Sequence, residues 1–345
     1  MNGWTGTHAG GSNHRGLTNL TSSRELLYLS RADVEKVGMS MKDVIGVVEQ
    51  AFVEKGLGKA QMPPKPSIAP HADSFIHAMP AYIPSMSAAG IKWISGYPDN
   101  YRRGLPYISG LIILNQPETG LPMAVMDATW VTAMRTGAAT AVAAKYLARQ
   151  DAESVAIIGC GVQGRTNLEA LVTQFPGLRH VHAYDIRPKG LNSYASEMRK
   201  RFDLEVTKDR SAREAVRCAD IVVTATPILK HPSPPIQGDW LQPGAFACPL
   251  DFDSSFAPSA FAAMDKLYTD DLQQQRHFVE EGYFLQMPQP HGDLGEVVCG
   301  LKPGRETRDE RIMSVNLGLA IEDMSAARRL YGLARRKGLG QYLEL

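Results

Sequence analysis

The sequence predicts an α/β protein in which a doubly wound parallel sheet is inserted into a second α/β domain. Three observations support this fold class: the length of 345 residues suits about two domains, strands alternate with helices in the middle, and a long amphipathic helix ends the chain. We expect a mobile tail at 1–23, an outer domain at 24–130 plus 312–345, and an inserted domain at 131–311. A site is then expected in the cleft between the two domains.

The overall composition argues against several classes of protein. With 37 Lys and Arg against 36 Asp and Glu, the formal net charge is +1, so we expect no nucleic-acid partner. No apolar run approaches the roughly 20 residues that span a bilayer, so we expect no membrane partner. The four cysteines are scattered without a CxxC pair, which predicts no metal site and favours a reducing, cytoplasmic location.

The N-terminal part of the chain changes from a polar tail to regular elements. Residues 1–23 are rich in Gly, Ser, Thr and Asn and lack the apolar core of a signal peptide; an arm that completes an oligomer interface is the alternative to a mobile tail. Ser40 and Asp43 form a capping-box pattern at the start of an amphipathic helix over Met41–Gly56. The proline-rich stretch 62–70 is expected to be a loop or an extended edge. Three strands follow, the last two as an antiparallel hairpin: Gly90–Ser95, Ile108–Asn115 and Met123–Asp127.

The middle of the chain alternates short apolar strands with helices, which is typical of a parallel sheet with right-handed crossovers. The predicted strands are Ser154–Ile158, His180–Tyr184, Asp220–Ala225, Ala245–Leu250 and Lys266–Thr269. The last helix is predicted over Ser314–Lys337, where apolar residues recur at helical spacing. This apolar stripe needs a partner surface, and we expect it to cover the N-terminal strands.

A glycine-rich loop joins the first strand and the first helix of the alternating region. The residues GCGVQG at 159–164 have the GxGxxG spacing. Gly159 permits a tight turn, Gly161 lets a pyrophosphate approach the backbone, and Gly164 lets helix and strand pack closely. This context predicts a Rossmann-type domain that binds NAD; a glycine turn without a ligand is the alternative.

The end of the next strand indicates which dinucleotide is bound. Asp185 suits the ribose hydroxyls of NAD and repels the 2′-phosphate of NADP, although the nearby Arg187 could bind that phosphate, so NADP is the less favoured cofactor. Thr224 and Thr226 close a later strand and either border the cofactor or simply end the strand. The candidate cofactor-binding residues are Gly159, Gly161, Val162, Gln163, Gly164, Asp185, Arg187, Thr224 and Thr226.

Two cationic residues lie in apolar surroundings before the nucleotide domain. Lys92 is inside the strand IKWI, and Arg135 is in a helix of small residues, AMRTGA. A buried charge needs a partner. A substrate carboxylate is one such partner. A structural ion pair with Asp127 or another acid is the alternative, and the spacing alone does not separate the two.

Over Leu26–Leu343 the chain resembles the ornithine cyclodeaminase/mu-crystallin family. The resemblance rests on the strand that contains Lys92 and on a set of motifs: MPAY at 79–82, TGLPMAVMDATWVTAMRTGAATAVAAKYLA at 119–148, GCGVQG, DLGEVVCG at 293–300 and SVNLGLAIEDMSAA at 314–327. It implies a discontinuous substrate-binding and dimerisation domain built from both ends of the chain, and hence a homodimer.

The resemblance also implies roles for single residues. Lys92 and Arg135 match the residues that hold the substrate α-carboxylate, and Lys65 falls where many members have a third such residue, usually Arg. Lys lacks the bidentate fork of Arg. Counting from Pro243, Asp253 falls on the acid that cyclodeaminases use as general acid/base, or Asp251 does if the register slips.

His77 replaces the Glu that ornithine cyclodeaminase has for the distal amine; a neutral His on a strand is the alternative interpretation. Ornithine is therefore a less favoured substrate. The family implies hydride transfer between nicotinamide and the Cα of an α-imino or α-amino acid, as an imino-acid reductase or amino-acid dehydrogenase. A cyclodeaminase acting on a diamino acid is the second hypothesis, and a non-catalytic, cofactor-binding protein like mu-crystallin is the third.

Overall fold

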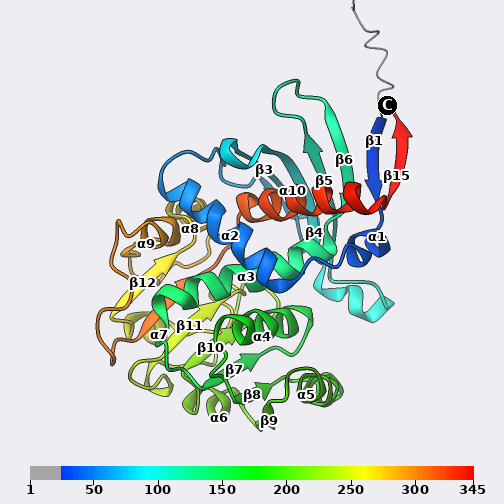
Figure 1. Ribbon diagram of the computed structural model, residues 1–345. Coiled ribbons are helices and arrows are strands. Elements are labelled where there is room, and N and C mark those ends of the chain that lie inside the picture. Colours follow the sequence, from blue (N-terminus) through cyan, green and yellow to red (C-terminus); the bar gives the residue numbers. More distant parts are fainter. Residues whose placement is uncertain (1–24) are drawn as a thin grey trace, which may run out of the picture.

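A mixed seven-stranded sheet forms one half of the molecule in the computed structural model, which describes residues 25–345 (Figure 1). The predicted tail at 1–23 lies outside this range. The strand order is β15-β1-β6-β5-β4-β3-β2. The strands are β1 (Glu25–Leu29), β2 (Ser67–Ile68), β3 (Phe75–Ile83), β4 (Ala88–Gly96), β5 (Ile108–Asn115), β6 (Pro122–Asp127) and β15 (Gln341–Glu344). The predicted hairpin of β5 and β6 is confirmed, because the two strands pair antiparallel.

Helices cover one face of this sheet. The last helix, α10 (Ala320–Lys337), packs on β3, β4 and β5, which confirms that it returns to the N-terminal strands. The prediction that it begins at Ser314 is wrong: Ile312–Val315 form strand β14, and the helix starts only at Ala320. Beside it lie α1 (Arg31–Lys36) and α2 (Met41–Gly56), the latter with the expected capping box. The 3₁₀ turns of this half are η1 (Pro84–Met86) and η2 (Pro98–Arg103).

The other half is a parallel eight-stranded sheet in the order β13-β12-β14-β11-β10-β7-β8-β9. Its order reverses around β7, as in a doubly wound fold. The strands are β7 (Ser154–Ile158), β8 (His180–Tyr184), β9 (Glu205–Lys208), β10 (Ile221–Thr224), β11 (Phe246–Pro249), β12 (Lys266–Thr269), β13 (Gly292–Asp293) and β14 (Ile312–Val315). Because β14 belongs here, the chain leaves this sheet at Val315, slightly later than the expected boundary at 312.

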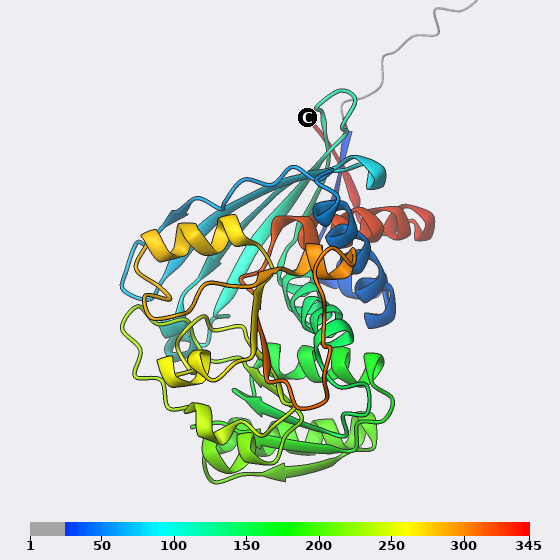
Figure 2. The same ribbon diagram turned by 90° about the vertical axis from the view of Figure 1, so that its left-hand side faces the viewer.

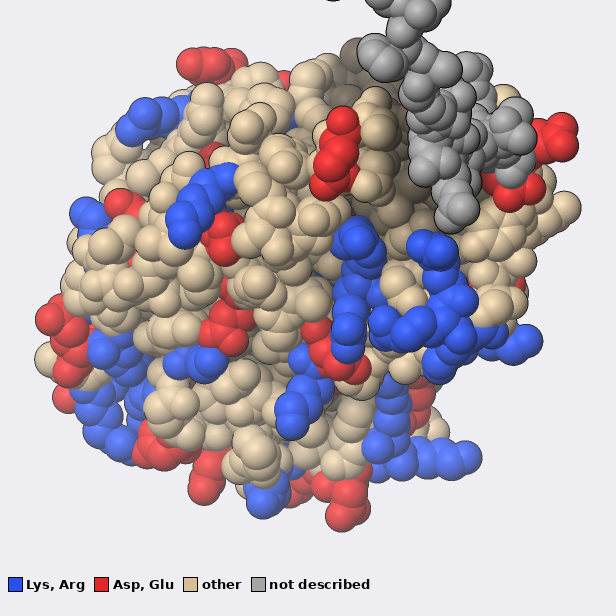
Figure 3. Space-filling view, turned by 45° about the horizontal axis from the view of Figure 1, so that its top comes forward, with Lys and Arg blue, Asp and Glu red and all other residues tan. Residues whose placement is uncertain are grey.

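Short crossover helices connect these strands. They are α4 (Val162–Gln174), α5 (Pro188–Phe202), α6 (Ala212–Arg217), α7 (Pro258–Ala262), α8 (Leu272–Glu280) and α9 (Leu294–Val298), with the 3₁₀ turn η3 (Gly238–Trp240). Within residues 25–345, none of the helices combines the length and apolarity that a membrane crossing requires. On the face in Figure 3, acidic and basic side chains are interspersed over much of the surface.

A single helix, α3 (Thr129–Leu147), joins the two halves and lies between their sheets (Figures 1 and 2). Most of its side chains are buried and small, so neighbouring helices approach closely. A Cβ atom at Gly137 would lie 2.5 Å from the backbone oxygen of Thr166 on α4. Helix α3 therefore packs against α4, which follows the glycine loop in one half, and against α2 and α10, which cover the sheet of the other half.

Candidate active site

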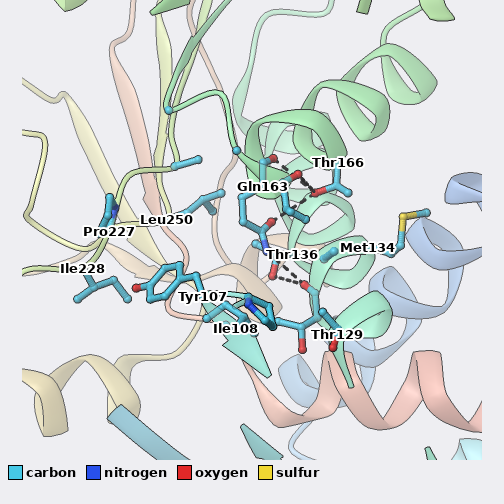
Figure 4. A pocket seen from close by; sticks show the side chains of 18 of the residues that line it. Tyr107, Ile108, Thr129, Met134, Thr136, Gln163, Thr166, Pro227, Ile228 and Leu250 are labelled. Carbon is cyan, nitrogen blue, oxygen red and sulfur yellow. Dashed lines mark hydrogen bonds between the residues drawn. The ribbon is translucent and has the colours of Figure 1, made fainter. Parts of the chain in front are cut away.

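A cavity of about 930 Å³ opens between the two halves, at the carboxyl end of the parallel sheet. Most of the residues predicted from the sequence meet in its lining: Lys65, His77, Lys92, Arg135, Gly159, Gly161, Val162, Gln163, Asp185, Arg187 and Thr226. Figure 4 shows Gln163, Thr136 and Thr166 on one side of the cavity and Tyr107 and Ile228 on the other. The space thus joins the glycine loop to the buried cations.

The glycine loop has the geometry that a dinucleotide needs. Gly159 has a φ of 99°, and a Cβ there would lie 2.5 Å from the backbone oxygen of Ala225. A Cβ at Gly164 would lie 2.4 Å from the oxygen of Gly159, whereas nothing lies within 4 Å of one at Gly161. Gly161 is also the N-cap of α4 and offers no side-chain cap. Open backbone at a helix N-terminus is suited to a pyrophosphate.

Asp185 is fixed directly beside this loop. Its Oδ2 accepts a hydrogen bond from the backbone N of Cys160 at 2.9 Å, and its Oδ1 accepts one from the backbone N of Arg187 at 2.8 Å. The guanidinium Nε of Arg187 lies 3.5 Å from the same carboxylate, and that side chain is mostly exposed. A carboxylate held in this place can accept hydrogen bonds from the hydroxyl groups of a ribose.

Lys92 and Arg135 both have acidic partners, and these come from the first turn of α10. Lys92 Nζ donates to Asp323 at 2.7 Å. Arg135 Nη1 donates to Glu322 Oε2 at 2.7 Å, and its Nε lies 3.0 Å from Asp323. Asp127 instead binds the backbone N and hydroxyl of Thr129. Both cations therefore form buried ion pairs, with Glu322 and Asp323 rather than with Asp127. They also line the cavity, so they remain within reach of a substrate.

Two further buried residues complete what we call the cation–acid cluster: Lys65, Lys92, Arg135, Asp270, Glu322 and Asp323. Lys65 Nζ donates to the backbone oxygens of Leu317 and Gly318 at 2.7 and 3.1 Å. Asp270 accepts a hydrogen bond from the backbone N of Gly318 at 2.7 Å. All six residues are buried, so three cations and three acids share a space of low polarity.

Burial in this cluster changes the proton affinities. Desolvation, assisted by the charge of Arg135, lowers the pKa of Lys92 to about 7. Desolvation lowers the pKa of Lys65 to about 8. Desolvation and the neighbouring Glu322 raise the pKa of Asp270 to about 7. The cavity is therefore lined by an amine, Lys92, that exchanges its proton near neutral pH.

His77 lies on β3 and is only 7% exposed. Its ring stacks on Phe75 at a centroid distance of 4.3 Å. Burial, together with the charges of Lys65 and Lys92, lowers its pKa to about 2. The imidazole is therefore neutral, and it offers no negative charge for the ammonium group of a substrate side chain.

Comparison with known proteins assigns the chain to a family. The sequence profile of the ornithine cyclodeaminase/mu-crystallin family matches residues 24–338. The chain belongs to the ornithine cyclodeaminase/mu-crystallin family. It is 38% identical to the alanine dehydrogenase of Archaeoglobus fulgidus over 330 residues, which cover 93% of this chain and 98% of that one.

Solved structures of other proteins support the same assignment. The Δ1-pyrroline-2-carboxylate reductase of Thermococcus litoralis, in complex with NADH and L-proline, has a TM-score of 0.84 and is 37% identical; the match covers 92% of this chain and 99% of that one. An archaeal alanine dehydrogenase dimer with bound NAD has a TM-score of 0.83 and is 36% identical, covering 93% and 99% of the two chains.

In this family member, the predicted acid Asp253 does not join the others. It is not among the cavity-lining residues, and its Oδ2 accepts a hydrogen bond from the backbone N of Phe284 at 2.7 Å. Asp251 is fully buried and accepts from the hydroxyls of Thr224, Thr226 and Ser255, each at 2.6 Å. Of the two predicted threonines, only Thr226 reaches the cavity, and Gly164 packs behind the loop.

The sequence analysis missed the acidic half of the cluster. Glu322 and Asp323 stand within the apolar stripe of the last helix, and Asp270 directly follows a buried strand. A charged residue in an apolar stretch of sequence indicates a buried charge that needs a partner, and this pattern identified Lys92 and Arg135. The same pattern could have identified these acids. Their partners could not be paired from sequence, because 231 residues separate Lys92 from Asp323.

Proposed function

We propose that the protein is an NAD-dependent oxidoreductase that transfers hydride between nicotinamide and the Cα of an α-imino or α-amino acid. The observation that carries the proposal is one cavity lined by both the glycine loop and the cations Lys92 and Arg135. The relatives named as alanine dehydrogenase and Δ1-pyrroline-2-carboxylate reductase support this reaction class. NAD is favoured over NADP because Asp185 is fixed beside the loop.

The cations would bind and orient the substrate. Arg135 presents a guanidinium fork and Lys92 an ammonium group, and together they suit a carboxylate. Binding the carboxylate fixes the position of Cα next to the glycine loop. When bound, the dinucleotide supplies or accepts the hydride. His77 and the aromatic rings near it leave the side-chain region uncharged, which favours a substrate without a distal amine.

Lys92 is also the residue best placed to exchange a proton with the substrate nitrogen. It lines the cavity, and its pKa of about 7 suits a proton donor and acceptor at neutral pH. In the reducing direction, Nζ gives a proton to the imine nitrogen and later regains one from solvent. Asp253, the acid predicted from the family, is engaged with the backbone of Phe284 and remains the alternative donor.

A two-part assay tests the proposed function. One part follows NADH consumption with 2-oxo acids plus ammonia or amines, and with cyclic imines. The other follows ammonia release from ornithine, lysine and shorter diamino acids with catalytic amounts of NAD. We expect net NADH oxidation in the first part. Ammonia release without net redox change would instead identify a cyclodeaminase, and NADH binding without any turnover would identify a cofactor-binding protein.

We also propose a homodimer formed through the uncovered face of the seven-stranded sheet. Opposite α10, three large apolar side chains of β4 and β5 are exposed: Trp93 at 49%, Leu111 at 46% and Ile113 at 36%. Trp93 and Leu111 are cross-strand neighbours, so they form one patch. Trp93→Glu should yield monomers in light scattering, whereas Leu301→Glu, at an exposed site on the other half, should leave the mass unchanged. A monomeric wild type would refute the proposal.

The thiols support a cytoplasmic location, which we propose as well. All four cysteines are free, and Cys160 and Cys248 are buried. Burial raises the pKa of both buried thiols to about 12, so neither readily forms the thiolate that disulfide exchange requires. Cell fractionation tests the location, and recovery outside the cytoplasm would contradict it.

A further inference from the structure

One short segment, Leu317–Asp323, holds all three cations of the cluster. Its backbone oxygens at Leu317 and Gly318 accept from Lys65, and its acids, Glu322 and Asp323, bind Arg135 and Lys92. The cations themselves come from three separate places: a loop before β2, strand β4 and helix α3. The substrate-facing cations are therefore positioned relative to one another by a segment near the C-terminal end of the chain.

Gly318 lets this segment pass close to Arg135. Its φ of +80° is in the left-handed region, and a Cβ atom there would lie 2.6 Å from Arg135 Nη1. Its backbone N also donates to Asp270. A side chain at this position would displace the guanidinium, so the segment is in direct contact with the groups that bind the substrate.

We propose that Asp323 is a positioning residue of the reaction, which fixes Lys92 in the cavity wall and favours its protonated form. The inference rests on the proposed function, because it concerns the group that exchanges the proton. Asp323 acts through Lys92 and has no contact with the substrate in this scheme. It is fully buried, so solvent cannot replace it as the partner of the ammonium group.

Of the charged and titratable groups that face Lys92, only Asp323 forms a hydrogen bond that favours its protonated form. Arg135 on α3 and Lys65 on the loop are cations and oppose its protonation, and His77 on β3 is neutral. Glu322 and Asp270 are acids, but neither hydrogen-bonds to Lys92. Asp323 supplies the largest contribution that raises the pKa of Lys92, and without it that pKa falls below about 7.

Glu322 provides a matched control. It precedes Asp323 in the first turn of α10, is equally buried, and also binds Arg135. Only Asp323 contacts Lys92. A purely structural role for the acidic pair would make the two amide variants behave alike, whereas a role through Lys92 separates them.

The experiment compares Asp323→Asn with Glu322→Gln by the pH dependence of kcat/KM for imine reduction. Reduction requires protonated Lys92, so activity falls on the basic limb of the profile. We expect Asp323→Asn to move this limb to lower pH by about one unit or more, since an opposite charge in contact shifts a pKa by roughly that amount. In amino-acid oxidation, which requires neutral Lys92, the acidic limb should move in the same direction. Glu322→Gln should raise KM through Arg135 and shift the limbs less.

Two results would overturn the inference: equal limb shifts in the two variants, or no shift in Asp323→Asn. If the amide variants do not fold, Asp323→Glu is compared with Glu322→Asp; only the former moves the charge that Lys92 contacts, and equal limb positions again contradict the role of Asp323. In all of these variants, the Kd of NADH, measured by fluorescence, should stay unchanged. This measurement shows whether the half that contains the parallel eight-stranded sheet is still folded. A wild type without turnover would refute the proposed function instead, which distinguishes the two failures.

Discussion

Lys92→Met is the substitution that tests the site most directly. Methionine keeps much of the shape and apolar volume of lysine but removes the charge and the transferable proton. Lys92 is buried in the cavity wall, and a methionine there offers neither a charge nor a hydrogen-bond donor to a substrate carboxylate. A hydrogen bond involving a charged group contributes about 1.5–3 kcal/mol, and a general acid about 10²–10⁴-fold in rate. We therefore expect kcat/KM to fall by at least about 10³-fold.

The same substitution should destabilise the fold only in part. Removing one member of a buried ion pair costs about 3–5 kcal/mol when the other is left alone. Asp323 keeps Arg135 at 3.0 Å, so we expect a loss of free energy of unfolding near the lower end, about 3 kcal/mol. Urea denaturation measures this value. The Kd of NADH should not change, because the glycine loop lies on the other half.

Lys42→Met is the control for this prediction, since Lys42 is exposed on α2 and away from the cavity. It should leave stability, NADH binding and kcat/KM near the wild-type values. Wild-type turnover in Lys92→Met would refute both roles assigned to Lys92. A parallel loss of NADH binding would show that the substitution acts on the whole structure rather than on the substrate.

Three further predictions concern the cofactor, the alternative acid and the packing between the two halves. Asp185→Ala should raise the Kd of NADH more than that of NADPH in fluorescence titrations; an equal rise would remove the basis for preferring NAD. Asp253→Asn should lower kcat less than about tenfold, because its carboxylate does not line the cavity, and a thousandfold loss would restore it as the acid. Gly137→Ala should lower the free energy of unfolding by about 1–3 kcal/mol, because its Cβ would meet the backbone of Thr166. Gly46→Ala, with open space around it, should raise the free energy of unfolding by about 0.5–1 kcal/mol. Equal effects of the two substitutions on thermal unfolding would contradict this prediction.

Elements with a strong local pattern were predicted closely. The capped helix α2 and the strands β5, β7, β8 and β12 have the expected bounds, because their periodicity and end signals lie within each segment. The three predicted strands do not include β3, although His77 on a strand was one interpretation; Pro80 interrupts the pattern of this segment. The neighbouring strand β2 pairs with β3 only at Ile76 and His77, so Pro80 needs no partner on that side.

The start of the last helix shows where local pattern fails. Three of the four residues IMSV at 312–315 are apolar, and the helix predicted from the sequence includes the last two, Ser314 and Val315. In the structure, β14 is inserted between β11 and β12 by pairing with strands far away in the chain. Gly318, with its positive φ, then turns the chain into α10. Strand pairing over long separations, rather than propensity, decides this boundary.

The charge balance of the cation–acid cluster bears on the kind of substrate. The charges of the three cations and three acids sum to zero. Asp270 and Lys92 both have pKa values near 7, and if both become neutral the net charge of the cluster is still zero. An α-amino acid, or an iminium with its carboxylate, adds no net charge to this buried space, whereas a 2-hydroxy acid adds one negative charge and is costly to bury.

We therefore expect an amino acid to bind the NADH complex more tightly than the hydroxy acid with the same side chain, for example alanine rather than lactate. Calorimetry of the two with the wild-type enzyme measures the difference. The preference should shrink in Glu322→Gln, because removing one acid leaves the cluster with an excess positive charge that favours an anion. If lactate binds as well as alanine in the wild type, the balance of buried charges does not select the substrate.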